Sequence, residues 1–283
     1  MVEASRTGES SEVRERTVSV EGQPARVFVG GRGERLLLVH GGWGGAALHW
    51  GPVLERLAGR FQVIAPDLPG IGRTDQRALG SVSDYARWLR ALLDALDVSG
   101  AWCAGNSFGA SVACRFASDY PSRCLGLVLV NGIPMPPSPK ALRWLGERRL
   151  GQRVLRTVEK AVAYSPWSLE RAFFDRGHVP EPLRALVREA SPPQVAALAD
   201  VLVQGGGPPA PSPVPPLLLW GREDHLPGTS ARAARKLHAS WRGSTLAFVE
   251  RAGHLPQLEN PDAFIDALAS FVRAGSPSAT AAS

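Results

Sequence analysis

A serine between two glycines has surroundings that suit covalent chemistry. The pentapeptide Gly-Asn-Ser-Phe-Gly, residues 105–109, follows an apolar run and precedes a helical pattern that begins Gly-Ala-Ser-Val-Ala. A serine hydroxyl is a poor nucleophile at neutral pH unless a neighbouring base accepts its proton. A sharp turn between strand and helix would expose that hydroxyl, and glycines leave room for the turn. We therefore predict Ser107 as a nucleophile that needs a base from another part of the chain.

Short apolar runs alternate with helical patterns on both sides of this serine. Continuous apolar runs predict strands buried on both faces, and their alternation with helices predicts a parallel sheet. We expect an opening pair of strands at 17–20 and 25–29, and further strands at 36–39, 61–64, 101–104, 125–130, 216–220 and 245–249. We expect helices near 48–58, 83–97, 108–119, 229–240 and 261–273. The predicted fold class is α/β, with a mostly parallel eight-stranded sheet and flanking helices.

The turn around Ser107 resembles the nucleophile elbow of the α/β-hydrolase superfamily, in its lid-containing branch that uses serine. Loops similar to those of the family recur in the family's order at residues 40–45, 67–74, 221–227 and 252–261. Each of these loops follows a predicted strand, and the carboxyl ends of parallel strands are where such sheets bind ligands. The resemblance covers nearly the whole chain and implies an enzyme whose site lies at that edge.

The resemblance also implies a base and an acid for the serine. His254 stands in the loop 252–261 that is similar to the family's histidine loop, and Asp224 stands in a Gly-x-x-Asp loop similar to that of the family's acid. An imidazole titrates near neutral pH, so it can accept the serine proton and return it to a leaving group. The aspartate would fix the imidazole tautomer. Glu223 is the alternative acid, which loop spacing disfavours, and the earlier strand where some relatives carry the acid ends here at Asn131.

The glycine-rich loop at 40–45 lies where the family builds half of its oxyanion hole. Glycines let backbone N–H groups approach a developing negative oxygen closely. The resemblance implies one donor N–H at Gly42 or Trp43 and a second at Phe108, where a helix begins. The loop 67–74, Asp-Leu-Pro-Gly-Ile-Gly-Arg-Thr, resembles a turn of the family that we interpret as structural, and we interpret the histidine that opens the first loop in the same way.

The alternation of strands and helices breaks between Ile133 and Pro213, where proline clusters bracket a helical stretch. Prolines at such borders mark where a segment leaves and rejoins a scaffold, so we expect an inserted helical lid at 133–213. The remaining ranges are then a disordered leader at 1–16, an α/β-hydrolase core at 17–132 and 214–274, and a disordered tail at 275–283. The residues of the lid that we consider as substrate contacts are Trp144, Trp167 and Phe173, although lid aromatics more often form lid core.

An arginine cluster lies within the predicted lid, on a helical pattern with an apolar opposite side. The arginines are Arg143, Arg148, Arg149, Arg153 and Arg156, and the apolar residues are Leu142, Leu145, Leu150, Val154 and Val158. Helices of this kind usually turn the apolar side inward, so we interpret the arginines as a solvated face. No recognised nucleic-acid-binding module accompanies the cluster, so we expect no nucleic-acid partner.

Composition excludes further classes of protein. The chain has 283 residues and a formal net charge of +6, and no apolar stretch approaches the ~20 residues of a membrane helix. The first 16 residues lack the apolar core of a secretory signal, and the three cysteines show no metal-type pairing. We therefore expect a cytoplasmic protein with no cofactor, metal or membrane partner. Its oligomeric state stays open.

A serine at the elbow argues against the haloalkane dehalogenases and epoxide hydrolases of the family, which use aspartate there. The favoured function is hydrolysis of an ester, thioester or similar acyl bond of a small, largely apolar substrate through an acyl-enzyme. Gly-Asn-Ser-x-Gly with Trp-Gly-Arg-x-Asp also resembles the carbon–carbon bond hydrolases, although Ala110 stands where that subgroup often has glycine. An acyl-eliminating lyase and a non-catalytic receptor of the same fold stay open as hypotheses, because a fold does not by itself define a function.

Overall fold

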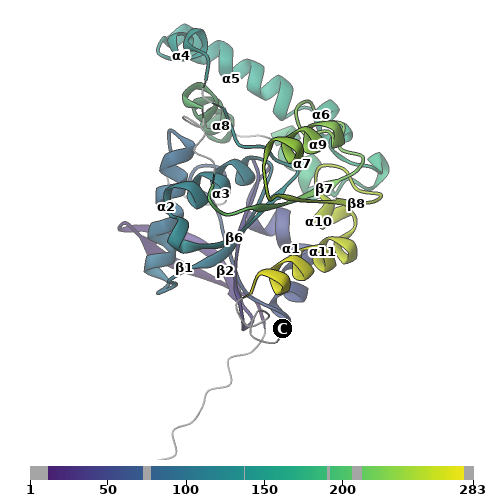
Figure 1. Ribbon diagram of the computed structural model, residues 1–283. Coiled ribbons are helices and arrows are strands. Elements are labelled where there is room, and N and C mark those ends of the chain that lie inside the picture. Colours follow the sequence, from purple (N-terminus) through teal and green to yellow (C-terminus); the bar gives the residue numbers. More distant parts are fainter. Residues whose placement is uncertain (1–11, 73–77, 137, 190–191, 206–211, 277–283) are drawn as a thin grey trace, which may run out of the picture.

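A mixed sheet of eight strands forms the centre of the protein (Figure 1). The computed structural model describes residues 12–72, 78–136, 138–189, 192–205 and 212–276. The strands are β1 (Arg14–Val20), β2 (Gln23–Gly30), β3 (Arg35–Val39), β4 (Gln62–Pro66), β5 (Ala101–Asn106), β6 (Cys124–Val130), β7 (Pro216–Gly221) and β8 (Thr245–Val249), in the spatial order β1-β2-β4-β3-β5-β6-β7-β8. Strand β2 pairs antiparallel with β1 and β4, and all other pairs are parallel. The predicted fold class is confirmed.

Helices cover both faces of the sheet, so the protein has two apolar layers. One face carries α2 (Val82–Ala95), α3 (Phe108–Asp119) and α9 (Ala231–Ser240), and the other carries α1 (Ala46–Ala58) and α11 (Pro261–Gly275). In β3, Leu37 and Val39 pack into the first layer, and Leu36 and Leu38 pack into the second. This division explains the continuous apolar run of the strand, because both of its faces are buried.

A run of helices lies between β6 and β7, and we call it the helical insertion. It consists of α4 (Lys140–Gly146), α5 (Arg149–Ala163), α6 (Pro166–Ala172), α7 (Glu181–Glu189) and α8 (Pro192–Gln204). Figure 1 shows these helices gathered at one end of the molecule, at the top of the view. Three short helical turns complete the elements: Pro121–Arg123, Arg176–His178 and α10 (Pro256–Glu259).

Three local expectations differ from the structure. The range 275–283 expected as a disordered tail begins inside α11, which runs to Gly275, and Ser276 is buried, whereas residues 277–283 lie outside the described residues. Strand β1 begins at Arg14, inside the range 1–16 expected as a disordered leader, and residues 1–11 of that range lie outside the described residues. Strand β8 is not buried on both faces, since only Val249 of its five residues is buried. It stands at the edge of the sheet, where β7 is its one neighbouring strand among the described residues. An apolar run alone does not distinguish these two situations.

Helix α5 also differs from the expected orientation. It is amphipathic as predicted, but Leu150, Val154 and Val158 are exposed instead of packed inward. The side that packs against the rest of the insertion carries Gly151, which is buried, and Leu155, which is half-buried. The apolar surface of α5 is therefore wider than the part that its neighbours cover.

Within the described residues, no helix is long and apolar enough to span a membrane. The same residues contain no group of three or more His, Cys, Asp or Glu side chains arranged to hold a metal ion. Cys103, Cys114 and Cys124 are all buried and carry free thiols.

Candidate active site

Ser107 occupies a strained turn between β5 and α3. Its φ of 55° and ψ of −117° lie in a region that residues with a side chain rarely adopt. A Cβ atom at Gly105 would stand 2.1 Å from the carbonyl oxygen of Gly109, and one at Gly109 would stand 2.2 Å from that of Val39. Both flanking positions therefore require glycine, which is the steric reason that the sequence pattern anticipated.

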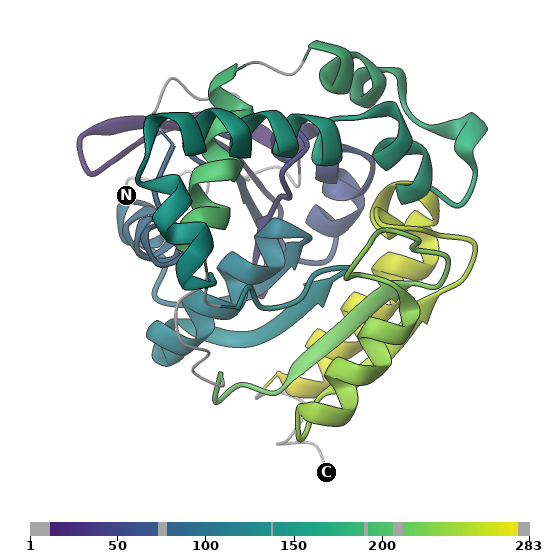
Figure 2. The same ribbon diagram turned by 90° about the horizontal axis from the view of Figure 1, so that it is seen from above.

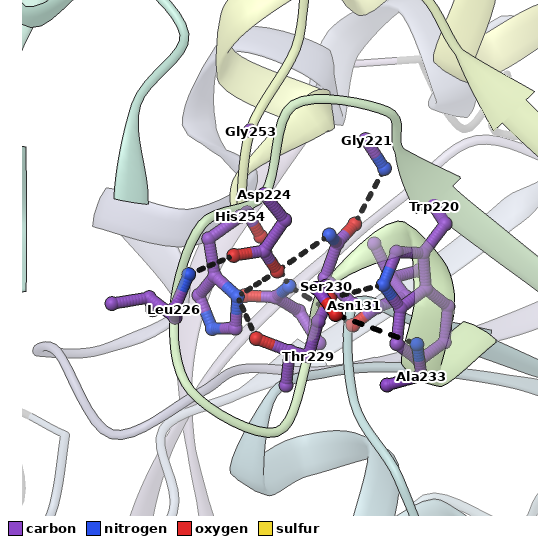
Figure 3. A network of polar contacts seen from close by, with 12 residues as sticks. Asn131, Trp220, Gly221, Asp224, Leu226, Thr229, Ser230, Ala233, Gly253 and His254 are labelled. Atoms are coloured by element: carbon purple, nitrogen blue, oxygen red, sulfur yellow. Dashed lines mark hydrogen bonds and ion pairs between the residues drawn. The ribbon is translucent and has the colours of Figure 1, made fainter. Parts of the chain in front are cut away.

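His254 and Asp224 meet in the loops that follow β8 and β7 (Figure 3). The imidazole Nδ1 lies 2.8 Å from Asp224 Oδ2, and both residues are buried. Since a carboxylate accepts, Nδ1 carries the proton, and the lone pair of a neutral ring is then on Nε2. The structure thus brings together the base and the acid that were predicted from loops 30 residues apart.

Asp224 is fixed by donors on both of its oxygens. The backbone N–H of Leu226 donates to Oδ1 at 2.9 Å, and Asn131 Nδ2 donates to Oδ2 at 2.9 Å. Asn131 Oδ1 in turn accepts from the N–H of Gly221 at 2.8 Å, as Figure 3 shows. Asn131, at the end of the strand where some relatives carry the acid, here holds the carboxylate of the later loop. Carboxylates in such settings stay oriented because several bonds must break before they can turn.

Glu223, the alternative acid, has a different position. Its Oε2 accepts a hydrogen bond from the N–H of Ala252 at 3.1 Å, and this bond ties the acid loop to the histidine loop. The carboxylate that contacts the imidazole of His254 is that of Asp224. The neighbouring His225 is exposed.

A half-buried carboxylate, that of Glu259, accepts hydrogen bonds from the histidine loop. Its two oxygens accept from the N–H groups of Gly253 and Phe174 at 2.8 and 2.7 Å. Burial raises the pKa of Glu259 to about 7, and these hydrogen bonds oppose that shift. The N–H of His254 donates to the carbonyl of Ala172, the last residue of α6, at 2.5 Å. No sequence pattern indicates these contacts, because they join segments that meet only in the folded chain.

The glycine-rich loop after β3 is attached to the end of α5. The Tyr164 hydroxyl donates to the carbonyl oxygen of Gly42 at 2.8 Å, and the indole N–H of Trp43 donates to the carbonyl of Ala163 at 2.7 Å. In a trans peptide the C=O and the following N–H point in opposite directions. Tyr164 therefore orients the peptide whose N–H belongs to Trp43, one of the two predicted donors of this loop. Burial raises the pKa of Tyr164, so its hydroxyl keeps the proton.

His49 is a site residue that the sequence did not reveal. Its ring, on α1, lies with Nε2 3.0 Å from the carbonyl of Trp43 and Nδ1 3.1 Å from Asn106 Oδ1. Burial lowers the pKa of His49 to about 3, so the ring is neutral and donates to one of these acceptors at a time. The ring of His49 thus links the backbone of the glycine-rich loop to the side chain of Asn106, the last residue of β5. A lone histidine on an apolar helix offers no local signal for this position.

The contacts of His40 and of the loop 67–74 are structural, as the sequence led us to expect. His40 Nε2 accepts from the N–H of Leu68 at 2.8 Å, and Nδ1 donates to the carbonyl of Gly41 at 2.7 Å. Asp67 Oδ1 accepts from the N–H of Ala46 at 2.6 Å, at the start of α1. Residues 73 and 74 of that loop lie outside the described residues.

A cavity of about 370 Å³ joins these parts, and both Ser107 and His254 line it. Gly42, Trp43 and Phe108, the predicted oxyanion-hole residues, line it as well, and most of the remaining wall is apolar. Glu159 of α5 is the acidic residue among the described lining residues, and burial raises its pKa to about 7. A carboxyl group in such a wall gives the cavity a polar point within an apolar surface.

The three aromatic residues considered as substrate contacts have different positions. Trp167 lines the cavity. Trp144 does not, because it lies on the outer surface of α4 with 55 % of its side chain exposed. Phe173 is buried in the apolar layer and is also absent from the cavity wall. The expectation is wrong for these two residues, since helical periodicity does not indicate which element faces which side of a lid.

Comparison with known proteins defines the family. The sequence profile of the alpha/beta hydrolase family matches residues 36–267, so the chain belongs to this family. It is 30 % identical to the pimeloyl-[acyl-carrier protein] methyl ester esterase of Pectobacterium carotovorum, over 84 % of this chain and 94 % of that protein. These findings make it a hydrolase.

Solved structures agree with this assignment. An esterase from Thermogutta terrifontis has a TM-score of 0.70 and 25 % identity, with 93 % of this chain and 99 % of that chain covered. The meta-cleavage product hydrolase of Pseudomonas fluorescens has a TM-score of 0.71 and 21 % identity, with 92 % and 98 % covered. At 21 % identity, the likeness to the meta-cleavage product hydrolase shows that the two proteins share a fold.

Proposed function

We propose that the protein is a serine-dependent hydrolase that cleaves an ester or similar acyl bond of a small, largely apolar substrate. The observation that carries this proposal is the hydrogen bond of 2.8 Å between His254 Nδ1 and the buried Asp224, at a cavity that Ser107 also lines. A neutral imidazole held in this tautomer has its free lone pair on Nε2, where a general base needs it. The curated relative named as an esterase supports the same class of reaction.

The reaction has two halves with the same proton carrier. Ser107 Oγ attacks the acyl carbon while His254 Nε2 takes its proton, and the bond to the leaving alkoxide breaks as His254 returns that proton. Water then attacks the acyl-enzyme, again losing a proton to His254, and the bond between the acyl carbon and Ser107 Oγ breaks with the proton returned to the serine. The products are an acid and an alcohol. Asp224 stays ionised and stabilises the imidazolium of each half.

The N–H groups of Trp43 and Phe108 stabilise the oxyanion of each tetrahedral intermediate. Phe108 is the first residue of α3, so its N–H is free of helical bonding and lies at the positive end of the helix dipole. Tyr164 fixes the peptide that carries the N–H of Trp43. Donors that are fixed before the reaction lower the barrier more than donors that must reorganise.

The cavity also restricts the substrate. Its volume of about 370 Å³ lies at the lower end of small-molecule sites, and its wall is mainly apolar. Glu159 would favour a substrate with a hydroxyl or amino group at the corresponding position, and would disfavour a carboxylate once it is ionised. These features distinguish short neutral acyl groups from dicarboxylic monoesters.

A fluorophosphonate probe tests the nucleophile directly. We expect covalent labelling of Ser107 and its loss in Ser107→Ala, together with hydrolysis of p-nitrophenyl acetate and butyrate that falls by several orders of magnitude in Ser107→Ala and His254→Ala. The matched control is Ser111→Ala, because Ser111 also lines the cavity and donates to the carbonyl of Ile133. A folded protein that is labelled elsewhere, or that hydrolyses esters equally well without Ser107, would refute the proposal. Cleavage of a vinylogous diketone without ester turnover would instead assign carbon–carbon hydrolysis.

A further inference from the structure

Helix α5 and its neighbours in the chain, α4 and α6, expose several large apolar side chains to solvent. We call this group of side chains the apolar row; it consists of Trp144, Leu150, Val154, Val158, Val162 and Trp167. Its members are between 47 and 73 % exposed, and the four on α5 follow one another at intervals of four residues, so they lie along one side of that helix. Of the eight large hydrophobic side chains that are exposed among the described residues, six belong to this row. Such concentration marks an interaction surface.

Cations accompany the apolar row. Arg149, Arg153, Arg156 and Lys160 recur at intervals of three or four residues on α5, are all exposed, and form a second line that we call the basic row. Residues 140–172 contain eight Lys or Arg and three Glu, a net charge of +5, while the whole chain has +6. Residues 140–172, which carry the apolar row, therefore account for most of the excess positive charge of the chain.

Both tryptophans of the apolar row are paired with an arginine. The Arg148 guanidinium carbon lies 3.4 Å from the ring centroid of Trp144, and that of Arg171 lies 4.9 Å from that of Trp167. Tryptophan beside a cation is typical of the boundary between lipid headgroups and acyl chains, because its ring is apolar and its N–H is polar. Figure 2, which looks down on this end of the molecule, shows α5 lying across it with no other element in front.

We propose that this face binds the surface of a membrane that contains anionic lipid, with α5 in the plane of the interface. The apolar row would enter the headgroup boundary, and the basic row would contact lipid phosphates. A second copy of the chain fits less well, because a symmetric contact would set two surfaces of the same positive charge against each other. This proposal differs from two expectations of the sequence analysis: that the arginines form a merely solvated face, and that the protein has no membrane partner.

The same face adjoins the cavity. Val162 and Trp167 belong to the apolar row and also line the cavity that contains Ser107. An ester dissolved in the lipid would then reach the cavity without passing through bulk water. This last consequence depends on the proposed function, whereas binding to the membrane does not, so the two can fail separately.

Sedimentation with vesicles tests the proposal without any activity measurement. We expect the full chain to sediment with vesicles of equimolar phosphatidylcholine and phosphatidylglycerol, and to stay in solution with phosphatidylcholine alone. Val158→Glu should weaken binding by on the order of tenfold, since it removes an apolar contact and adds a negative charge. Leu125→Glu is the matched control: it also replaces an aliphatic side chain by glutamate, at a residue of nearly the same exposure, 50 against 52 %, on β6 and outside the helical insertion. It should bind as the unchanged chain does.

Two further measurements locate the contact. Replacing Arg153 and Lys160 by Gln should weaken binding by about fivefold for each cation, and high salt should have the same effect. Hydrogen exchange of residues 149–163 should slow when anionic vesicles are added. The proposal is overturned if the chain ignores anionic vesicles, if Val158→Glu binds as tightly as Leu125→Glu, or if light scattering finds a dimer in solution that Val158→Glu dissolves, which would assign the face to a second copy.

Discussion

Removal of the Tyr164 hydroxyl, in the variant Tyr164→Phe, should slow catalysis although this residue does not contact the reacting atoms. In Tyr164→Phe the carbonyl of Gly42 loses its donor at 2.8 Å, so the peptide that carries the N–H of Trp43 loses one restraint. A hydrogen bond of this kind contributes about 1 kcal/mol, which corresponds to about fivefold in rate. Complete loss of an oxyanion donor costs about 100-fold or more, which is the upper bound. We therefore expect kcat to fall by about five- to 50-fold.

The Michaelis constant separates this role from a general loss of packing. The oxyanion forms only after attack, so KM for p-nitrophenyl butyrate should change by less than about twofold while kcat falls. Tyr85→Phe is the matched control, because the Tyr85 hydroxyl also donates from a buried position to a backbone carbonyl, that of Pro69, at 2.9 Å. Both variants should lose about 1 kcal/mol of unfolding free energy.

Steady-state kinetics and urea denaturation of the two variants decide the matter. If Tyr164→Phe and Tyr85→Phe lose the same stability and neither loses kcat, then the tyrosine at the end of α5 is only a packing residue. If KM rises in Tyr164→Phe while kcat is unchanged, then the hydroxyl contributes to ground-state binding, and the reasoning from the orientation of the peptide is wrong.

Other substitutions test separate parts of the site. In Asn131→Ala the N–H of Gly221 loses its acceptor and Asp224 loses a donor. We therefore expect an unfolding free energy that is lower by about 2 kcal/mol in urea denaturation, and kcat/KM lower by about tenfold. An unchanged rate would show that Asn131 does not position the acid. Because the folded pKa of Glu159 is about 7, above the ordinary value of 4.5, the folded state retains a proton that the unfolded state releases, and unfolding free energy should fall as pH rises between these values. Glu159→Gln should remove this fall, on the order of 2 kcal/mol between about pH 5 and about pH 8, and equal slopes in both proteins would contradict it. Gly109→Ala should lower the melting temperature in calorimetry by well over ~5 °C, because its Cβ would stand 2.2 Å from a backbone oxygen, and a melting temperature like that of the unchanged chain would show that the turn can relax.

The elements and the elbow could be predicted because their causes are local. Apolar runs and helical periodicity indicate which residues of a short stretch of chain are buried. The eight predicted strands therefore correspond to the eight observed among the described residues. Gly105 and Gly109 record a steric requirement within one turn. The meeting of His254 with Asp224 is not local, but each residue follows a strand, and neighbouring parallel strands end at the same edge of the sheet.

The remaining contacts of the site depend on surfaces that face each other only after folding. The ring of His49, on α1, turns back to the carbonyl of Trp43 in the loop that precedes this helix, and no sequence pattern indicates this contact. The helical insertion was the least predictable part, since Trp144 and Phe173 are aromatic like Trp167 but only Trp167 reaches the cavity. An amphipathic pattern states that a helix has an apolar side and leaves open what covers that side.

The contacts between the helical insertion and the core explain how one scaffold can carry different substrate walls. Backbone carbonyls at the ends of two helices form part of the attachment: that of Ala163 accepts from Trp43, and that of Ala172 accepts from His254. Backbone acceptors survive any change of side chain, so residues between them, such as Trp167, can vary without releasing the catalytic loops. Two side-chain groups of the insertion also take part: the hydroxyl of Tyr164, the residue that follows Ala163, and the guanidinium of Arg171, which donates to the carbonyl of His225 at 3.2 Å. A substitution of Tyr164 should therefore affect turnover of every substrate, whereas changes in the wall should affect the choice between substrates.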